Sequence, residues 1–157
     1  MTAMMKILVP IDFEEASDIA LTYGRNLAKA FGAELHVLHV MENQFLRLTF
    51  KSAAAVEAGI ANRVAERLTP EDRTSLRAVT ALRMSDVPSD EIIQYAKLEG
   101  IDLIVMGTHG RAHTAHVLMG SVAEKVVRTA PCPVLTVHHP EREFVISDVA
   151  ERSRISA

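Results

Sequence analysis

The chain has 157 residues, which fits one domain and is long enough to bury a sizeable core. Hydrophobic residues make up 48% and charged residues 24%, an ordinary globular composition, and the net charge of −3, without a lysine- or arginine-rich stripe, argues against nucleic acid as a partner. The lack of a membrane-length apolar run, of a secretory signal and of a second cysteine beside Cys132 favours a cytoplasmic protein with no membrane partner and no internal disulfide.

The first half of the chain alternates between strands and helices. A short apolar run at residues 7–11 predicts a buried strand that ends at Asp12, and residues 34–40 predict a second strand. Between them a helical period begins at Glu15 and ends at Gly32, the expected C-terminal cap. The apolar positions of this helix recur every three or four residues: Ala16, Ala20, Tyr23, Leu27 and Phe31.

Residues 43–51 follow neither period and carry four apolar side chains, Phe45, Leu46, Leu48 and Phe50. Two interpretations stay open: a lid over a pocket, or packing against the next helix. That helix is predicted over residues 53–68 and is expected to end at Thr69-Pro70.

The second half continues the alternation. Residues 76–82 predict a weaker third strand suited to a sheet edge, and Pro88 opens a third helix that Gly100 would cap. Residues 103–106 predict a fourth strand, residues 121–130 a helix and residues 134–137 a fifth strand. Five strands alternating with helices predict an α/β fold, a parallel sheet with helices on both faces.

Three glycines, Gly107, Gly110 and Gly120, follow the fourth strand, and Ser121 opens the next helix. Glycines let backbone N–H groups approach a ligand, and a helix N-terminus adds unsatisfied donors and a positive dipole end. The layout therefore predicts an anion site. The structural alternative is a plain turn at Gly107 and Gly110, with Ser121 as an ordinary N-cap.

Carboxylates are concentrated after the first strand, in Asp12-Phe13-Glu14-Glu15. They would repel phosphate, so a phosphate tail is expected at the glycines and Ser121 instead. Asp12 is then left for a ribose hydroxyl or for a metal ion, Mg²⁺ or Mn²⁺. Adenine would reach the second strand, where the backbone of Val40 offers one donor and one acceptor.

The spacing G-x2-G-x9-G-S, between a strand and the P-C-P-V-L-T-V run, resembles the ATP-binding branch of the universal stress protein family. The segments K-I-L-V-P-I-D, L-H-V and G-I-D-L-I-V-M-G-T-H-G-R extend the resemblance over residues 5–138. It implies a single-domain Rossmann-like fold of the adenine nucleotide alpha hydrolase type, with strand order 3-2-1-4-5. It also implies a domain over residues 1–138 and a homodimer through the last strand, to which a C-terminal tail, residues 139–157, could contribute.

The same resemblance implies adenine contacts near Pro10 and at Val40, an adenosine contact at Asp12, and phosphate contacts along the glycine loop. Ile11 is a departure, because some nucleotide-binding members carry a small polar residue there. Arg111 could approach phosphates or be an ordinary solvated arginine. The full expected set is Pro10, Ile11, Asp12, Val40, Met106, Gly107, His109, Gly110, Arg111, Gly120, Ser121 and Val122.

Histidines suggest one further alternative. His109, His113 and His116 are spaced by four and three residues, as a metal site on a helical turn would require, but no acidic or thiol ligand lies beside them. His36 and His39 are out of phase on the second strand, which favours structural roles. The P-loop pattern and recognisable catalytic triads are missing.

Taken together, the residues and the resemblance predict an ATP-binding (or AMP- or ADP-binding) regulatory or sensing dimer, for which the resemblance allows at most slow ATP hydrolysis or autophosphorylation. Two alternatives stay open. One is a divalent-metal-dependent ATPase or nucleotide hydrolase that uses Asp12, and the other is a nucleotide-free dimeric interaction module.

Overall fold

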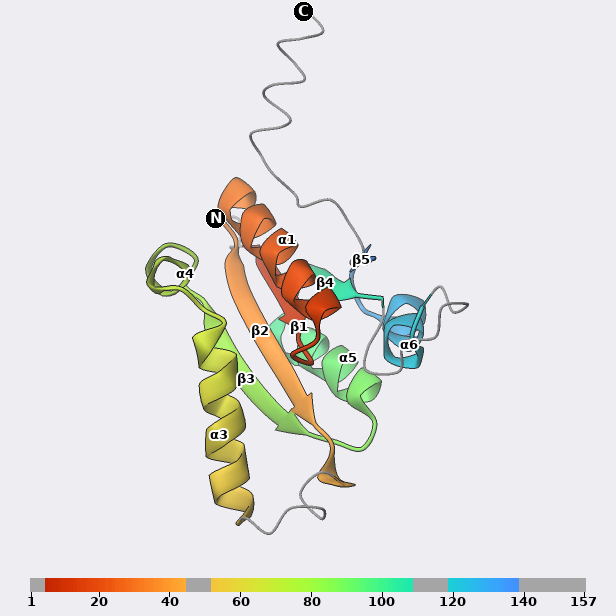
Figure 1. Ribbon diagram of the computed structural model, residues 1–157. Helices are drawn as coiled ribbons and strands as arrows, with labels where there is room; N and C mark the ends of the chain where they lie inside the picture. Colours follow the sequence, from red (N-terminus) through yellow and green to blue (C-terminus); the bar gives the residue numbers. More distant parts are fainter. Residues whose placement is uncertain (1–4, 45–51, 109–118, 139–157) are drawn as a thin grey trace, which may run out of the picture.

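The computed structural model describes residues 5–44, 52–108 and 119–138 of the chain. In chain order its elements are β1 (Lys6–Pro10), α1 (Glu15–Phe31), β2 (Glu34–Met41), α3 (Ala53–Glu66), α4 (Pro70–Ser75), β3 (Val79–Met84), α5 (Pro88–Glu99), β4 (Leu103–Gly107), α6 (Ser121–Thr129) and β5 (Val134–Val137). The strands form one parallel sheet in the order β3-β2-β1-β4-β5 (Figure 1), which confirms the predicted fold class and strand order. None of the helices in these ranges is both long and apolar enough to cross a membrane.

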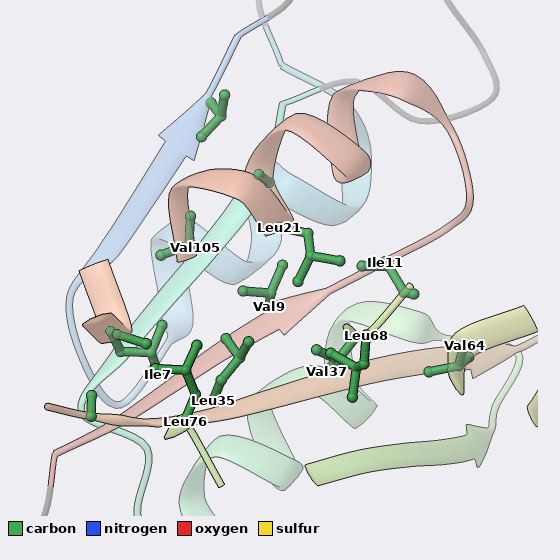
Figure 2. Packing of buried hydrophobic residues seen from close by; sticks show 14 of the residues in the cluster. Ile7, Val9, Ile11, Leu21, Leu35, Val37, Val64, Leu68, Leu76 and Val105 are labelled. Atoms are coloured by element: carbon green, nitrogen blue, oxygen red, sulfur yellow. The ribbon is translucent and has the colours of Figure 1, made fainter. Parts of the chain in front are cut away.

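Helices cover both faces of the sheet, and each face has its own core cluster. On one face Ile7 and Val9 of β1 pack with residues of α1 and α3 (Figure 2). On the other face Leu8 packs with residues of α5 and α6. The alternation along β1 follows from the two-residue period of a strand, and all three side chains are fully buried because β1 is central.

The face that α1 buries agrees with the predicted one except at its C-terminal end. Ala16 and Ala20 are buried as predicted, but Phe31 is 62% exposed, and the small residues Gly24 and Ala28 are also buried. A Cβ added at Gly24 would lie 2.4 Å from Cγ2 of Val9, so the helix approaches β1 too closely for a larger side chain. The spacing of the larger apolar residues therefore did not reveal that Gly24 and Ala28 also lie against the sheet.

The prediction also missed α4. Thr69 and Pro70 do not only end the second helix; Thr69 is the N-cap of α4 and Pro70 lies in its first turn. A capping box joins Thr69 and Asp72, each side chain accepting the other residue's backbone N–H. The third strand consequently starts at Val79 and not at residue 76, and it forms a mostly exposed sheet edge as expected.

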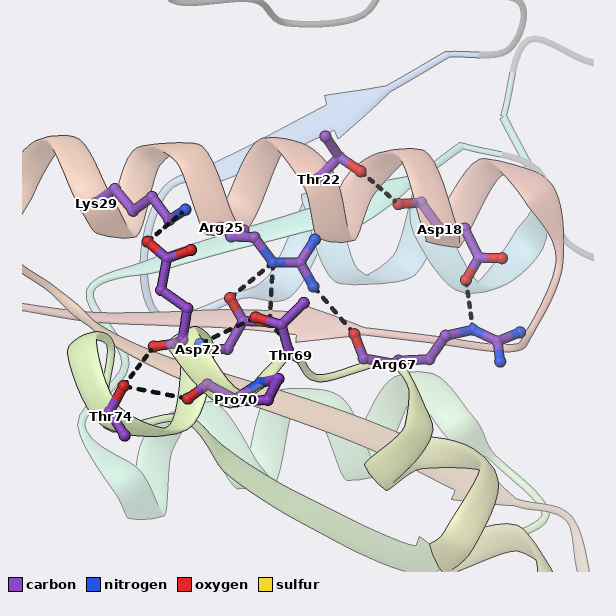
Figure 3. A network of polar contacts seen from close by, with 10 residues as sticks. Asp18, Thr22, Arg25, Lys29, Arg67, Thr69, Pro70, Asp72 and Thr74 are labelled. Atoms are coloured by element: carbon purple, nitrogen blue, oxygen red, sulfur yellow. Dashed lines mark hydrogen bonds and ion pairs between the residues drawn. The ribbon is translucent and has the colours of Figure 1, made fainter.

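A polar network fastens α4 to α1 (Figure 3). The Nε of Arg25 donates to both carboxylate oxygens of Asp72, at 2.8 and 2.9 Å, and its NH2 group donates to the carbonyl of Arg67. The Asp72 side chain is fully buried. Arg67 in turn pairs with Asp18 at 2.9 Å. These contacts hold the α3–α4 junction against the middle of α1.

Candidate functional site

The strands end at a cavity of about 610 Å³, called here the edge cavity. The carboxyl ends of β1, β2 and β4 form its floor, α3 reaches it from one face of the sheet, and α5 and α6 reach it from the other. Its position at the point where the chain order reverses, between β1 and β4, is where open parallel sheets bind ligands. Its volume falls within the range of ordinary small-molecule pockets.

Asp12 is oriented by the turn between β1 and α1. Its backbone N–H donates to the Oγ of Ser17 at 3.2 Å, and its Oδ1 accepts the backbone N–H of Glu14 at 3.0 Å. The Oγ of Ser17 donates to the carbonyl of Glu14, which closes the turn. One carboxylate oxygen of Asp12 is therefore used to fix the side chain, and a half-buried carboxylate is held in the cavity wall.

Aromatic and cationic side chains form the wall on the α3 side. The ring of Phe13 lies 4.6 Å from that of His39, and the guanidinium of Arg63 lies 4.0 Å from the centroid of the Phe13 ring. The Nδ1 of His39 lies 2.7 Å from the carbonyl oxygen of Ile11, so this nitrogen carries the proton. His39 is thus satisfied by the backbone, as expected for a structural histidine, although it also lines the cavity.

The opposite end is built from the end of β4 and the start of α6. Thr108 is buried; its N–H donates to the carbonyl of Val137 and its carbonyl accepts the N–H of Gly120 at 2.5 Å. Its Oγ1 lies 3.2 Å from the Nδ1 of His138. These bonds fix Gly120, the N-cap of α6, at the cavity.

Gly120 caps α6 without a side chain, so Ser121 is the first helical residue and not the N-cap. The N–H of Glu124 donates to the carbonyl of Gly120, which leaves the N–H groups of Ser121, Val122 and Ala123 ahead of the first intrahelical bond. The cavity is lined by these three residues. Backbone donors and the positive end of the helix dipole therefore face the same space.

Gly107 has a packing role that the sequence did not predict. A Cβ at this position would lie 2.9 Å from the carbonyl carbon and 3.0 Å from the Cβ of Ala16 in α1. The missing side chain lets the first turn of α1 approach the end of β4. The close approach required at Gly107 is thus between two elements of the fold.

The structure brings most of the predicted site residues together around the edge cavity: Pro10, Ile11, Asp12, Val40, Met106, Gly107, Gly120, Ser121 and Val122. Three further predictions, His109, Gly110 and Arg111, lie outside the described residues. The same applies to His113 and His116 of the metal alternative and to the apolar residues at 45–50. Within the described ranges no group of three His, Cys, Asp or Glu side chains could hold a metal ion.

Sequence reasoning missed several residues of this region, among them Phe13, Ser17, Arg63, Thr108 and His138. Phe13 and Thr108 directly follow strands that were predicted, so their place at the sheet edge could have been inferred. Arg63 gave no such signal, because its position depends on how α3 packs over β2 and β3.

Comparison with known proteins gives one consistent result. Residues 4–138 match the universal stress protein family. Universal stress protein MJ0531 of Methanocaldococcus jannaschii is 33% identical over 150 residues, which cover 88% of this chain and 84% of that protein.

Comparison with solved structures also finds universal stress proteins. Universal stress protein UspA from Lactobacillus plantarum has a TM-score of 0.71 and 28% identity, covering 87% of this chain and 99% of that one. A universal stress protein solved in complex with cAMP has a TM-score of 0.64 and 23% identity, covering 87% of this chain and 98% of that one.

Proposed function

We propose that this chain, which belongs to the universal stress protein family, binds an adenine nucleotide in the edge cavity and acts as a regulatory or sensing protein. The observation that carries the proposal is that one cavity is lined both by the first residues of α6, with their backbone donors, and by the Asp12 carboxylate. A solved structure of this fold is a complex with cAMP. Because its identity to this chain is 23%, the similarity shows the fold alone, and the proposal rests on the cavity itself.

The phosphates belong at the α6 end. The N–H groups of Ser121, Val122 and Ala123 supply donors there, and no carboxylate of the described cavity lining belongs to that helix. A polyphosphate at a helix N-terminus gains both hydrogen bonds and the favourable dipole. ATP fits this end better than AMP, because more phosphate oxygens are available to the donors.

The adenosine belongs at the other end. The carboxylate of Asp12 disfavours phosphate but accepts hydrogen bonds from ribose hydroxyls, or holds a Mg²⁺ or Mn²⁺ ion beside them. Val40 at the end of β2 lines the cavity, where its backbone would meet the base, and the side chains of Ile11 and Met106 make this part of the lining apolar. This arrangement matches the usual mix of apolar walls and few polar groups in ligand sites.

Sensing fits the lining better than rapid turnover. The charged side chains that line the described cavity are Asp12, Glu42 and Arg63, and no lysine is among them. Slow hydrolysis or autophosphorylation is compatible with this set. A dimer through β5 completes the proposal, because within the described residues β5 pairs only with β4 and its other edge is available.

Nucleotide binding is tested most directly on the purified protein. Heat denaturation followed by mass spectrometry of the supernatant identifies nucleotide retained from the cell, and calorimetric titration with ATP, ADP and AMP, with and without EDTA, measures affinity and metal dependence. Absence of both retained nucleotide and ATP binding would refute the proposal. Sedimentation at equilibrium checks the dimer separately.

The phosphate end can be tested at a single N–H. Ser121→Pro removes the first donor of α6 while keeping the helix, because proline is favoured at this position and Gly120 already has an extended ψ of 161°. Ser121→Ala is the matched control, which removes the hydroxyl but keeps the N–H. We expect the proline variant to bind ATP about tenfold more weakly than the alanine variant. Equal affinities would show that this N–H does not contact phosphate.

A further inference from the structure

Arg63 is the basic side chain of the described cavity lining, and it is held there by an aromatic ring. Its guanidinium carbon lies 4.0 Å from the centroid of Phe13, a stacking distance, while Arg67 reaches the same ring only at 5.3 Å. Phe13 is supported in turn by His39, whose ring lies 4.6 Å away. Arg63 is therefore positioned by contacts with a planar group.

The neighbouring arginines are used differently. Arg25 pairs with Asp72 at 2.8 Å and Arg67 pairs with Asp18 at 2.9 Å. Arg63 makes no ion pair with any residue of the described ranges, and its side chain is exposed. Cation–π stacking occupies one face of a guanidinium and leaves the other face and the edge for a second planar group.

We propose that Arg63 recognises the base of the bound nucleotide: the base stacks on the guanidinium, which itself stacks on Phe13. This inference rests on the proposed nucleotide binding and adds a specificity-determining residue to it. Arginine planes are used in this way where proteins stack nucleobases. The ring of Phe13 then acts as a positioning group, since it holds the plane that the base would contact.

Location and charge favour the base over a phosphate as the group at Arg63. Arg63 comes from α3, which packs on one face of the sheet, whereas α6 approaches the cavity from the other. Asp12 immediately precedes Phe13 and would oppose an anion there. Ile60, one turn earlier on α3, and Met41 add apolar surface that suits a planar base.

The test separates stacking from charge. Calorimetric titrations with adenosine, ATP and inorganic tripolyphosphate are run on the wild type, Arg63→Ala and Arg63→Lys. Arg128→Ala is the control, because it removes an exposed arginine that pairs with Glu124 and does not line the cavity. We expect Arg63→Ala to weaken adenosine and ATP by the same factor, about tenfold, to leave tripolyphosphate unchanged, and not to be rescued by lysine.

Each other outcome overturns the inference. A loss that grows from adenosine to ATP and is restored by lysine would assign Arg63 to phosphate. Unchanged affinities in Arg63→Ala, with a wild type that binds ATP, would remove Arg63 from the site while leaving the proposed function intact. A wild type that binds neither adenosine nor ATP would refute the proposed function itself.

A second variant tests the stack independently of Arg63. Phe13→Leu keeps an apolar side chain but removes the ring on which the guanidinium lies. We expect it to weaken adenosine binding, and we expect the losses of Phe13→Leu and Arg63→Ala not to add in the double variant. Additive losses would show that the two side chains act separately and would contradict the three-layer stack.

Discussion

The sharpest stability prediction concerns Asp72, whose fully buried carboxylate joins α4 to α1 (Figure 3). Asp72→Asn keeps the shape and removes the charge. Arg25 donates to both carboxylate oxygens, and the N–H of Thr69 donates to Oδ2 at 2.8 Å. In either orientation of the amide, its NH2 group faces one of these donors.

The expected loss of stability can be estimated from these contacts. Removing one partner of a buried ion pair costs about 3–5 kcal/mol, and the lower end applies because the Arg25 side chain is 19% exposed and water can reach it. We therefore expect Asp72→Asn to lower the free energy of unfolding by about 3 kcal/mol. In a domain of this size that corresponds to a fall in Tm of roughly 6–12 °C.

Glu124→Gln is the matched control, because it makes the same carboxylate-to-amide change in an exposed pair with Arg128. Such pairs contribute about 0–1 kcal/mol. Urea unfolding of both variants followed by circular dichroism gives the comparison. If Asp72→Asn loses no more stability than Glu124→Gln, the buried pair does not stabilise the α4–α1 contact.

The pH dependence of the same difference provides a second check. Burial alone would raise the pKa of the Asp72 carboxyl, but the hydrogen bonds from Arg25 and from the backbone of Thr69 outweigh it and hold this pKa below its usual value of 3.8. The stabilisation is therefore fully present above pH 3.8 and is lost as the pH falls through the lower folded-state pKa. The gap between wild type and Asp72→Asn should narrow only in that acid range.

Two further predictions follow from other contacts. Gly107→Ala places a Cβ 2.9 Å from the backbone of Ala16 and should destabilise the ligand-free protein by about 1–3 kcal/mol in urea unfolding, whereas an unchanged midpoint would show that α1 can shift without cost. Burial, reinforced by the carboxylates of Glu99 and Glu34 against the opposing charge of Arg83, raises the pKa of Tyr95 to about 12. The neutral phenol thus stabilises the fold below pH 10, and this contribution is lost as the pH rises through 12. In an absorbance titration of the tyrosines, Tyr95→Phe should remove the ionisation step near pH 12. A step that the substitution leaves unchanged would contradict its assignment to Tyr95.

The central strands could be predicted because burial on both faces leaves a continuous apolar run, as in β1 and β4. Local turn chemistry was equally readable: Gly32 and Gly100 adopt the left-handed φ, 62° and 65°, expected of helix C-caps. The signal for α4 was also present, since Thr69-Pro70 followed by Asp72 is a helix start. It was read as a helix end because proline also follows terminated helices.

The site residues also fall into two groups: the positions of some follow from local sequence patterns, and the positions of others depend on long-range packing. Asp12 and Val40 could be placed at the cavity because strand ends of a parallel sheet share one edge. Arg63 could not be placed there, because no local pattern indicates which side of α3 lies next to that edge of the sheet. The packing role of Gly107 could not be predicted for a similar reason: the Ala16 backbone that requires a glycine there belongs to a helix far away in the sequence.

The backbone at Phe13 links the fold to the site. Its φ of 68° is left-handed, a conformation that costs a bulky residue about 1–2 kcal/mol and that glycine would adopt without this penalty. The turn from β1 to α1 therefore does not require a phenylalanine. The contacts of its ring with His39 and Arg63 offset part of this conformational cost. Both of these partners line the edge cavity. A strained aromatic residue at a position where glycine would serve the turn is best explained by a use of its ring in the cavity, and positioning Arg63 is such a use.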